Sequence, residues 1–421
     1  MLIELAAVDG TVESGGKGAA LVELVRAGLP VPPTWVLPAG ALRDHLARSD
    51  LVALAAQVEV GVANGAWRPT ARQLQSAILR APLPGDVARP VAGLLAGLRA
   101  SGEHATLAIR SSATCEGLPG ASFAGQFQTF LGVEDFEQAS TAIRSCWASL
   151  WSPAALSYRA ALGSASGPGM AVLLQVFVPG EGAGAARVHD DGVEIESAWG
   201  LGPSVLSGLV VPDRYWLGLD GQLLRAEPGR KPVRATAQGG NLVWEPVRTP
   251  LQEAPSLDQA AAGRVARLAL KAANCLGMPL EMEWVLDGDA VWVLQGRRAR
   301  RLPWPGIGPI NQPGDGELHG IPAAPGEVVG RVRLVERLED LDEADPGGIV
   351  VMRYASAAML ARFRCAGLVT EMGGSSAHAA ATARERRLPM VTGVLGITQR
   401  LHEGQVVGLD GARGVVEVLE P

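Results

Sequence analysis

Residues 373–389 read Gly-Gly-Ser-Ser-Ala-His-Ala-Ala-Ala-Thr-Ala-Arg-Glu-Arg-Arg-Leu-Pro, a glycine turn followed by helix-forming residues and a helix stop. Glycines permit backbone angles that other residues resist, and Ser375 or Ser376 is expected to cap the start of the helix. The stretch from Ala379 to Arg387 consists almost entirely of good helix formers, and the proline that follows ends it. The segment therefore predicts a helix directly after the turn, with His378 just inside its start.

His378 occupies a place in this helix where an imidazole can act as a nucleophile. A helix N-terminus carries unpaired N–H groups and a partial positive charge, which favour a phosphoryl group and disfavour a protonated imidazole. Both effects suit a neutral histidine that accepts a phosphoryl group. A histidine at a helix start also serves as a capping or packing residue, and this segment alone leaves both interpretations open.

Composition and charge narrow the classes of protein to which the chain belongs. The chain has 421 residues and a formal net charge of −6, which argues against a nucleic acid or other polyanion recognised by charge. Its four cysteines are scattered without CxxC or CxH spacing, so neither a structural zinc site nor a disulfide framework is expected. The sequence contains no apolar run long enough to cross a membrane and no secretory leader pattern. We therefore expect a cytoplasmic protein.

One stretch of the chain interrupts its periodic pattern. Residues 301–316 are too rich in proline and glycine for a helix or an inner strand, which predicts a linker. Residues 1–300 mix helical and strand patterns, and residues 317–421 form a second domain of about 100 residues, a usual size. The strands expected there are Ile349–Met352, Leu368–Thr370, Met390–Val391, Val406–Leu409 and Gly414–Val418, and the helices are Ala357–Phe363 and Ala377–Arg387. The fold class expected is α/β, with an α+β domain followed by a compact α/β domain.

Three segments before the linker have residues suited to a nucleotide. The first is Ser-Gly-Gly-Lys-Gly at residues 14–18, which precedes an apolar helical pattern from Ala19 to Ala27. A lysine among glycines at a helix start can approach phosphate closely, which makes Lys17 a candidate phosphate ligand. The GxxxxGK[ST] spacing is absent, and Gly18 stands where a Walker A loop requires Ser or Thr. The alternative is a flexible turn with a solvated lysine.

The second segment is the short strand Leu107–Thr114, which leads to Gly-Ala-Ser-Phe-Ala-Gly-Gln at residues 120–126. This strand delivers Arg110 into a hydroxyl-rich loop, and a guanidinium fork beside small donors suits phosphate oxygens. An Arg110 paired with a nearby acidic residue is the alternative interpretation.

The third segment, residues 280–297, alternates apolar and polar residues around an Asp-Gly turn, which predicts a hairpin. With a three-residue loop, Glu283 lies opposite Gln295 on one face of the hairpin. The same register places Glu281 opposite Arg297. A carboxylate beside an amide oxygen offers ligands for Mg²⁺, which binds one or two protein oxygens together with phosphate and water. An ordinary solvent-facing hairpin is the alternative.

The order of these segments resembles the phosphoenolpyruvate synthase, pyruvate phosphate dikinase and rifampin phosphotransferase group, in which an ATP-grasp domain is joined to a swivelling phosphohistidine domain. The matching residues before the linker are Gly15-Gly16-Lys17-Gly18, Arg110-Ser111-Ser112-Ala113, Ser122-Phe123-Ala124-Gly125-Gln126, Cys146-Trp147-Ala148-Ser149-Leu150-Trp151, Trp199-Gly200-Leu201-Gly202, Pro212-Asp213, Glu283-Trp284 and Leu294-Gln295-x-Arg297. Those after it are Pro325-Gly326, Gly373-Gly374, His378-Ala379-Ala380, Ala383-Arg384-Glu385, Pro389 and Asp410-Gly411. Several motifs in one order are more specific than any motif alone.

The resemblance implies roles for the candidate residues. The residues implied to bind ATP are Lys17, Arg110, Gln175, Glu283, Gln295 and Arg297. Among them, Glu283 and Gln295 would also bind Mg²⁺, and Arg297 would contact the transferring group during catalysis. Gln175 would line the nucleotide pocket, although glutamine is also a common neutral residue of strands.

The resemblance also implies a reaction. His378 would attack the β-phosphoryl of ATP, release AMP, lose the terminal phosphate to water and pass the remaining phosphoryl group to a small-molecule acceptor. Such covalent catalysis divides one difficult transfer into two easier ones. The swivel linker would let the histidine travel between its loading and unloading positions.

The chain departs from the family pattern at several positions. Ala377 precedes His378 where relatives usually have Ser, Thr or Cys, and Ser375 or Ser376 is expected to compensate. Residues 182–189 lack the usual Ser-Gly-Val-x-Phe-Thr pattern, and residues 296–298 read Gly-Arg-Arg where relatives have Ser-Arg-Pro. These changes affect the expected nucleotide geometry and leave the candidate ATP and His positions intact.

A further departure concerns the phosphoryl acceptor. Neither the pyruvate-binding barrel nor the rifampin-binding domain of the resembling enzymes is recognisable, so pyruvate is not expected as the substrate of this chain acting alone. Two function classes remain. The chain is either a phosphotransferase whose small-molecule acceptor binds between the two expected domains, or a phosphoryl-donor or phosphocarrier subunit that docks on a separate acceptor-binding protein. No nucleic acid and no membrane partner is expected.

Overall fold

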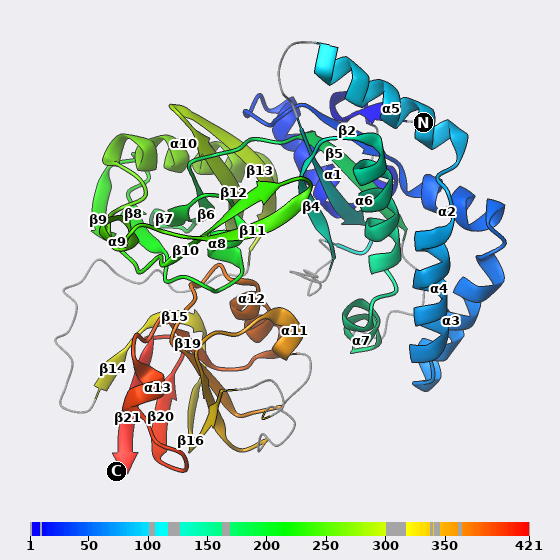
Figure 1. Ribbon diagram of the computed structural model, residues 1–421. Helices are drawn as coiled ribbons and strands as arrows, with labels where there is room; N and C mark the ends of the chain where they lie inside the picture. Colours follow the sequence, from blue (N-terminus) through cyan, green and yellow to red (C-terminus); the bar gives the residue numbers. More distant parts are fainter. Residues whose placement is uncertain are drawn as a thin grey trace. The chain divides into compact units, whose positions relative to one another are not determined.

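The computed structural model of the chain (Figure 1) describes residues 2–8, 11–100, 106–116, 127–161, 169–299, 317–336, 340, 346–360 and 364–420. The chain packs into two compact units. The first comprises Met1–Pro179, Thr236–Val243 and Trp292–Arg297, and the second comprises Gly180–Ala235, Trp244–Val291 and Arg298–Pro421. The expected linker at 301–316 lies outside the described residues, so a division into domains at 1–300 and 317–421 stays a prediction.

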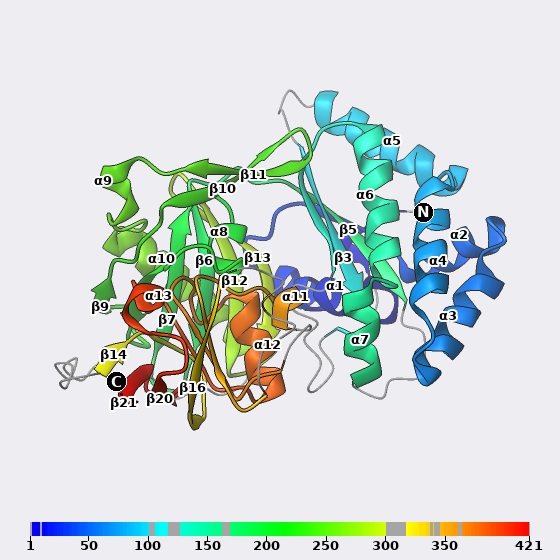
Figure 2. The same cartoon turned by 60° about the horizontal axis from the view of Figure 1, so that its bottom comes forward.

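The first unit is built on an antiparallel five-stranded sheet in the order β1-β2-β5-β3-β4. Its strands are β1 Ile3–Glu4, β2 Thr34–Leu37, β3 Leu107–Ala113, β4 Thr129–Val133 and β5 Met170–Val176. Its helices are η1 Leu5–Ala7, α1 Thr11–Arg26, α2 Ala39–Arg48, α3 Val52–Asn64, α4 Arg68–Arg80, α5 Gly85–Ala100, α6 Phe136–Ser149 and α7 Pro153–Ala161. Figure 2 shows α4 between α3 and α6 beside this sheet. Ile109 and Leu174 of the sheet pack in one core with Ile78 of α4 and Trp147 of α6.

The second unit contains a six-stranded antiparallel sheet in the order β13-β12-β6-β7-β8-β9, whose outermost strand β13 runs into the first unit. Its strands are β6 Gly182–Val188, β7 Val193–Trp199, β8 Asp213–Leu217, β9 Leu223–Glu227, β12 Leu280–Asp287 and β13 Ala290–Arg298. Its helices are α8 Pro203–Leu206, α9 Thr249–Gln252 and α10 Gln259–Leu276. A separate ribbon pairs β10 Val233–Gln238 with β11 Asn241–Pro246, and its central residues Thr236–Val243 belong to the first unit. Buried alanines such as Ala262, Ala266 and Ala269 line α10, and these small side chains allow the helix to lie close to β6 and β12.

An eight-stranded sheet forms the rest of the second unit, in the order β14-β21-β20-β16-β17-β18-β19-β15. Its elements are β14 Glu317–His319, β15 Ile321–Ala324, β16 Glu327–Val335, β17 Ile349–Met352, α11 Ala357–Leu360, β18 Gly367–Thr370, α12 His378–Arg386, β19 Met390–Thr392, α13 Ile397–Arg400, β20 Val406–Asp410 and β21 Val415–Glu420. Strands β16 to β19 are parallel. Alternate residues of β17 enter opposite cores, since Val350 packs with Ala380 of α12 and Val351 packs with Ile397 of α13.

These elements confirm the α/β class expected from the sequence, and the five apolar runs expected after residue 316 all fall on strands. The expected helix Ala357–Phe363 is seen as Ala357–Leu360, and its last three residues lie outside the described residues. The expected helix at the Lys17 segment is longer than predicted, because α1 begins at Thr11 and includes a kink at Gly15, with φ 68° and ψ 178°.

Candidate active site

His378 is the first residue of α12, and it follows a turn at the carboxyl end of β18. Gly373 adopts a φ of 121°, and a Cβ atom there would lie 2.4 Å from Thr392 Oγ1, so the turn requires glycine at this position. The His378 side chain is half-buried, and its backbone carbonyl accepts a hydrogen bond from Thr382 Oγ1 at 2.9 Å. The expected location of His378 at a helix start after a glycine turn is therefore confirmed.

The expected serine cap of this helix is wrong. The N-cap residue is Ala377, and no side chain caps the helix. The backbone N–H groups of Ser375 and Ser376 instead donate to the two carboxylate oxygens of Glu196 at 2.7 and 2.8 Å. The physical reason is non-local, because Glu196 lies on β7 of the six-stranded sheet and reaches the turn from another element.

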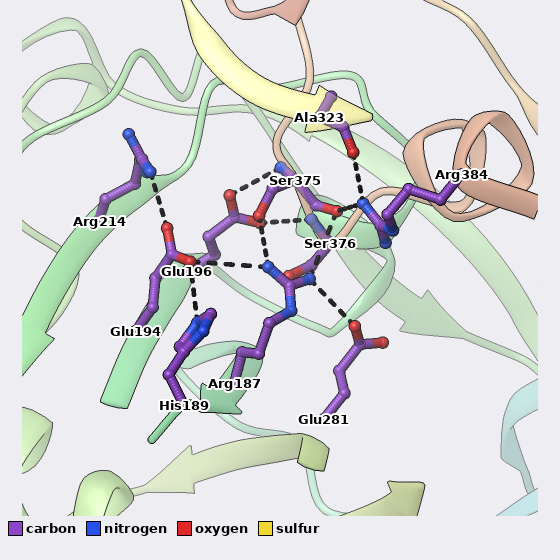
Figure 3. A network of polar contacts seen from close by, with 10 residues as sticks. All are labelled: Arg187, His189, Glu194, Glu196, Arg214, Glu281, Ala323, Ser375, Ser376 and Arg384. Atoms are coloured by element: carbon purple, nitrogen blue, oxygen red, sulfur yellow. Dashed lines mark hydrogen bonds and ion pairs between the residues drawn. The ribbon is translucent and has the colours of Figure 1, made fainter. Parts of the chain in front are cut away.

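The turn that precedes His378, residues 373–377, is here called the His378 loop, and Figure 3 shows the polar network around it. Arg187 on β6 donates to the Ser375 hydroxyl at 3.0 Å. Arg384 on α12 donates to the carbonyl oxygens of Ser375 and Ala323 at 2.8 and 2.7 Å. The loop is thus held both by its own helix and by the six-stranded sheet.

Arg187 is the centre of a buried ion-pair network on that sheet. It donates to Glu281 at 3.1 Å from the adjacent strand, where the two residues are cross-strand partners, and it lies 3.6 Å from Glu194. Burial opposes the charged form of Arg187, but the surrounding carboxylates raise its pKa above the ordinary value. Burial likewise opposes ionisation of Glu194, yet the Arg214 guanidinium at 2.7 Å keeps the pKa of that carboxyl well below its usual range.

Arg187 and Glu196 were not among the residues expected from the sequence to act at the site. Arg187 falls within residues 182–189, the segment noted above for its departure from the family pattern. The sequence contains a signal that could have identified Glu196. Charged residues stand at alternate positions of an otherwise buried strand in Val-Glu-Ile-Glu-Ser at 193–197. The expected pairing of Glu281 with Arg297 across the hairpin stays a prediction, and on its other side Glu281 pairs with Arg187 of β6.

Three of the expected nucleotide-binding residues lie together in the first unit. Arg110 on β3 donates to the side-chain oxygens of Gln175 and Gln295 at 3.4 and 3.0 Å. It also donates to the carbonyl oxygen of Leu294 at 2.5 Å. Gln175 in turn donates to Thr34 Oγ1 at 3.0 Å and is buried. These three partners of Arg110 are amide-type oxygens, and phosphate binding by this group remains a prediction.

The Lys17 segment packs against the end of the strand that carries Arg110. Ser112 Oγ donates to the carbonyl of Ser14 and accepts from the Gly18 amide, at 2.7 and 3.1 Å. Lys17 forms an ion pair with the buried Glu116, so the alternative of a solvated lysine is wrong. The two expected phosphate-binding segments are thus brought together, while residues 120–126 of the second lie outside the described residues.

The expected metal ligands lie on a hairpin that differs from the prediction in its turn. Strand β12 ends at Asp287 and β13 begins at Ala290, so the loop has two residues and the expected three-residue loop is wrong. Glu283 and Arg297 are both half-buried, and Glu283 pairs on its other side with Ala185 of β6. Within the described residues no group of three or more His, Cys, Asp or Glu side chains could hold a metal ion. The shared metal site of Glu283 and Gln295 stays a prediction.

Comparison with known families decides the relationship that the motifs suggested. The family described as pyruvate phosphate dikinase, AMP/ATP-binding domain, matches residues 12–304, and the mobile domain of PEP-utilising enzymes matches residues 344–414. The chain belongs to the pyruvate phosphate dikinase family. This membership confirms the resemblance stated from the sequence and the expectation of a family that uses ATP and Mg²⁺.

Relatives of this dikinase-family chain are enzymes named phosphoenolpyruvate synthase. A probable phosphoenolpyruvate synthase of Methanothermobacter thermautotrophicus is 34% identical over 423 residues, covering 96% of this chain and 61% of the relative. The phosphoenolpyruvate synthase of Aeropyrum pernix is 30% identical over 462 residues, covering 96% of this chain and 56% of the relative. The chain therefore spans somewhat more than half the length of these relatives. No helix in the described part of the chain is long and apolar enough to cross a membrane.

Proposed function

We propose that this chain transfers the β-phosphoryl group of ATP to His378 and then to an acceptor. The observation that carries the proposal is the position of His378, at the start of α12 and beside a loop that the six-stranded sheet holds. That sheet lies within the residues matched by the AMP/ATP-binding family, and α12 lies within those matched by the mobile domain. A contact between the His378 loop and a sheet of the nucleotide-binding family region supports His378 as the nucleophile.

The proposed loading step is a displacement at phosphorus. A neutral imidazole nitrogen of His378 bonds to the β-phosphorus while the bond from that phosphorus to the oxygen of AMP breaks. AMP leaves, and water then takes the terminal phosphoryl group as phosphate, which leaves one phosphoryl group on His378. Because little covalent chemistry falls to other residues in phosphoryl transfer, positioning and charge neutralisation supply most of the rate enhancement.

The remaining candidates supply that charge and positioning in the proposal. Lys17 and Arg110 hold phosphate oxygens, Gln175 lines the nucleotide pocket, and Arg297 contacts the transferring group. Glu283 and Gln295 offer a carboxylate and an amide oxygen, the hard donors that Mg²⁺ prefers, so the donor set fits the metal. When bound there, Mg²⁺ neutralises phosphate charge as it develops.

Incubation with ATP and Mg²⁺ alone tests this function. We expect AMP to form together with a phosphoenzyme that is labile in acid and stable in base, as a phosphohistidine is. The variant His378→Ala is expected to form neither, whereas His402→Ala, at an exposed histidine of the same eight-stranded part, serves as the matched control and retains both. A phosphoenzyme that persists in His378→Ala would refute the proposal.

The second candidate function is that of a phosphoryl-donor subunit for a separate acceptor-binding protein. The chain aligns with 61% of the first relative's length, and the destination of the phosphoryl group is decided by direct transfer assays. The purified phosphoenzyme is therefore offered pyruvate, fractionated metabolites and protein fractions in separate reactions. Loss of label to a small molecule supports the stand-alone transferase, and loss of label only to a protein fraction supports the subunit.

A further inference from the structure

The carboxylate of Glu196 makes an unusual contact with the His378 loop. Its two oxygens accept from the consecutive backbone N–H groups of Ser375 and Ser376 at 2.7 and 2.8 Å, and the Glu196 residue is only 1% exposed. Hydrogen bonds to an ionised acceptor are shorter and about twice as strong as neutral ones. A buried carboxylate that lost both donors would lose two charge-assisted hydrogen bonds, so the contact constrains the loop strongly.

Arg187 of the six-stranded sheet also contacts the His378 loop. Its Nη1 donates to the Ser375 hydroxyl at 3.0 Å, and its Nη2 donates to the Ser375 carbonyl oxygen at 3.5 Å and to Glu281 at 3.1 Å. The Glu196 carboxylate thus accepts from two loop amides, and the Arg187 guanidinium donates to a loop hydroxyl. A displacement of the loop would break both contacts at once.

Close packing around Gly374 leaves no room for a side chain at this position. A Cβ atom built there would lie 2.6 Å from Pro212 Cγ and 2.8 Å from one Glu196 carboxylate oxygen. The Gly373 amide also donates to the Val210 carbonyl at 3.0 Å. Backbone, steric and charged contacts therefore converge on one short segment of the His378 loop.

The buried carboxylates of this sheet differ in their partners. Glu194 lies beside Arg187, Arg214 and His189, and Glu281 lies beside Arg187. The oxygens of the buried Glu196 accept from the Ser375 and Ser376 amides. The His378 loop thus supplies hydrogen-bond donors that a buried carboxylate requires.

We propose that Glu196 and Arg187 are positioning residues for the loading of His378, acting by holding the His378 loop on the six-stranded sheet. The inference rests on the proposed function and adds the groups that set the histidine in place. The α-carbon of His378 lies two residues beyond that of Ser376, hence within about 7.6 Å of it. Fixing the Ser375 and Ser376 amides therefore fixes the start of α12, and phosphoryl transfer loses rate steeply when its reacting groups are misplaced.

The first arm of the test measures the contact without any nucleotide. Hydrogen exchange of the Ser375 and Ser376 amides is followed in the full chain and in Glu196→Gln, which keeps the side-chain size and loses one acceptor oxygen. We expect exchange to accelerate at least tenfold. The matched control is Glu227→Gln, a carboxylate of the same six-stranded sheet whose ion pairs go to Arg214 and Arg225, and we expect less than a threefold change. Unchanged exchange in Glu196→Gln, or an equal rise in the control, would overturn the proposal.

The second arm measures the rate of phosphoenzyme formation from ATP labelled at the β position. Glu196→Gln is expected to load at least tenfold more slowly, with an unchanged KM for ATP and an unchanged rate of label loss from enzyme already phosphorylated. A slower release of label or a raised KM would indicate a general structural defect and contradict a positioning role.

Arg187→Lys provides a second variant should Glu196→Gln fail to fold, because it keeps the charge and loses the guanidinium fork. It is expected to change exchange and loading in the same direction. If the unsubstituted chain takes no label at all, the proposed function fails, whereas the exchange measurement still decides whether Glu196 holds the loop.

Discussion

Substitution of Gly374 by alanine places one methyl group between the His378 loop and the six-stranded sheet. The added Cβ would lie 2.6 Å from Pro212 Cγ and 2.8 and 3.0 Å from the two carboxylate oxygens of Glu196. These separations are shorter than atoms in contact tolerate, so the loop must shift away from the sheet. Overpacking by a methyl group in a tightly packed site costs about 1–3 kcal/mol. That range corresponds to about a 5- to 150-fold reduction in the population of the docked loop.

The assay is the rate of phosphoenzyme formation from β-labelled ATP, which should fall by the same factor as the docked population. Gly408→Ala is the matched control, since its Cβ would meet only the Leu419 side chain at 3.7 Å and farther, an ordinary contact. Circular dichroism melting of both variants checks that each remains folded. A loading rate for Gly374→Ala within twofold of the unsubstituted chain would refute the reasoning, as would an equal loss in Gly408→Ala.

Three further predictions concern stability and reactivity. Asp213→Asn leaves the fully buried Lys231 without its ion-pair partner, and we expect urea denaturation to show a loss of about 3–5 kcal/mol. Iodoacetamide at pH 8 should label the exposed Cys275 first, because burial raises the pKa of the Cys146 thiol to about 12, and mass spectrometry of early time points checks the order. The pKa of the Glu194 carboxyl is depressed in the folded chain. The stability that this carboxylate contributes is therefore present above its ordinary pKa of 4.5 and is lost as the pH falls below that value. The urea midpoints at pH 6 and pH 3 should differ less in Glu194→Gln than in the unsubstituted chain.

Local pattern predicted much of the fold correctly. The apolar runs that became β17, β18 and β19 are buried on both faces, which is the reading that continuous Val, Ile and Leu runs support in a parallel sheet. The start of α12 at His378 followed from a glycine turn and a run of alanines, both local properties of the chain. Residues close in sequence determine such features, so the sequence alone was sufficient for them.

The features that were missed depend on residues distant in sequence. Ser375 and Ser376 were expected to cap the helix, but Ala377 is the N-cap residue, and the backbone N–H groups of the two serines pair with Glu196, 179 and 180 residues away along the chain. Helix and capping propensities depend on neighbouring residues, so they do not indicate a partner that is distant in the chain. Similarly, the hairpin pattern gave no indication that Glu281 also pairs with Arg187 on β6, a strand almost a hundred residues earlier. Pairing between distant strands was the information that the local pattern lacked.

The location of the label in the phosphoenzyme tests the central claim most directly. The chain is incubated with Mg²⁺ and either β-labelled or γ-labelled ATP, digested under alkaline conditions, and the labelled peptide is identified. The account predicts label from the β position alone, on the peptide that contains His378. Label from the γ position, or on a peptide without His378, would contradict it.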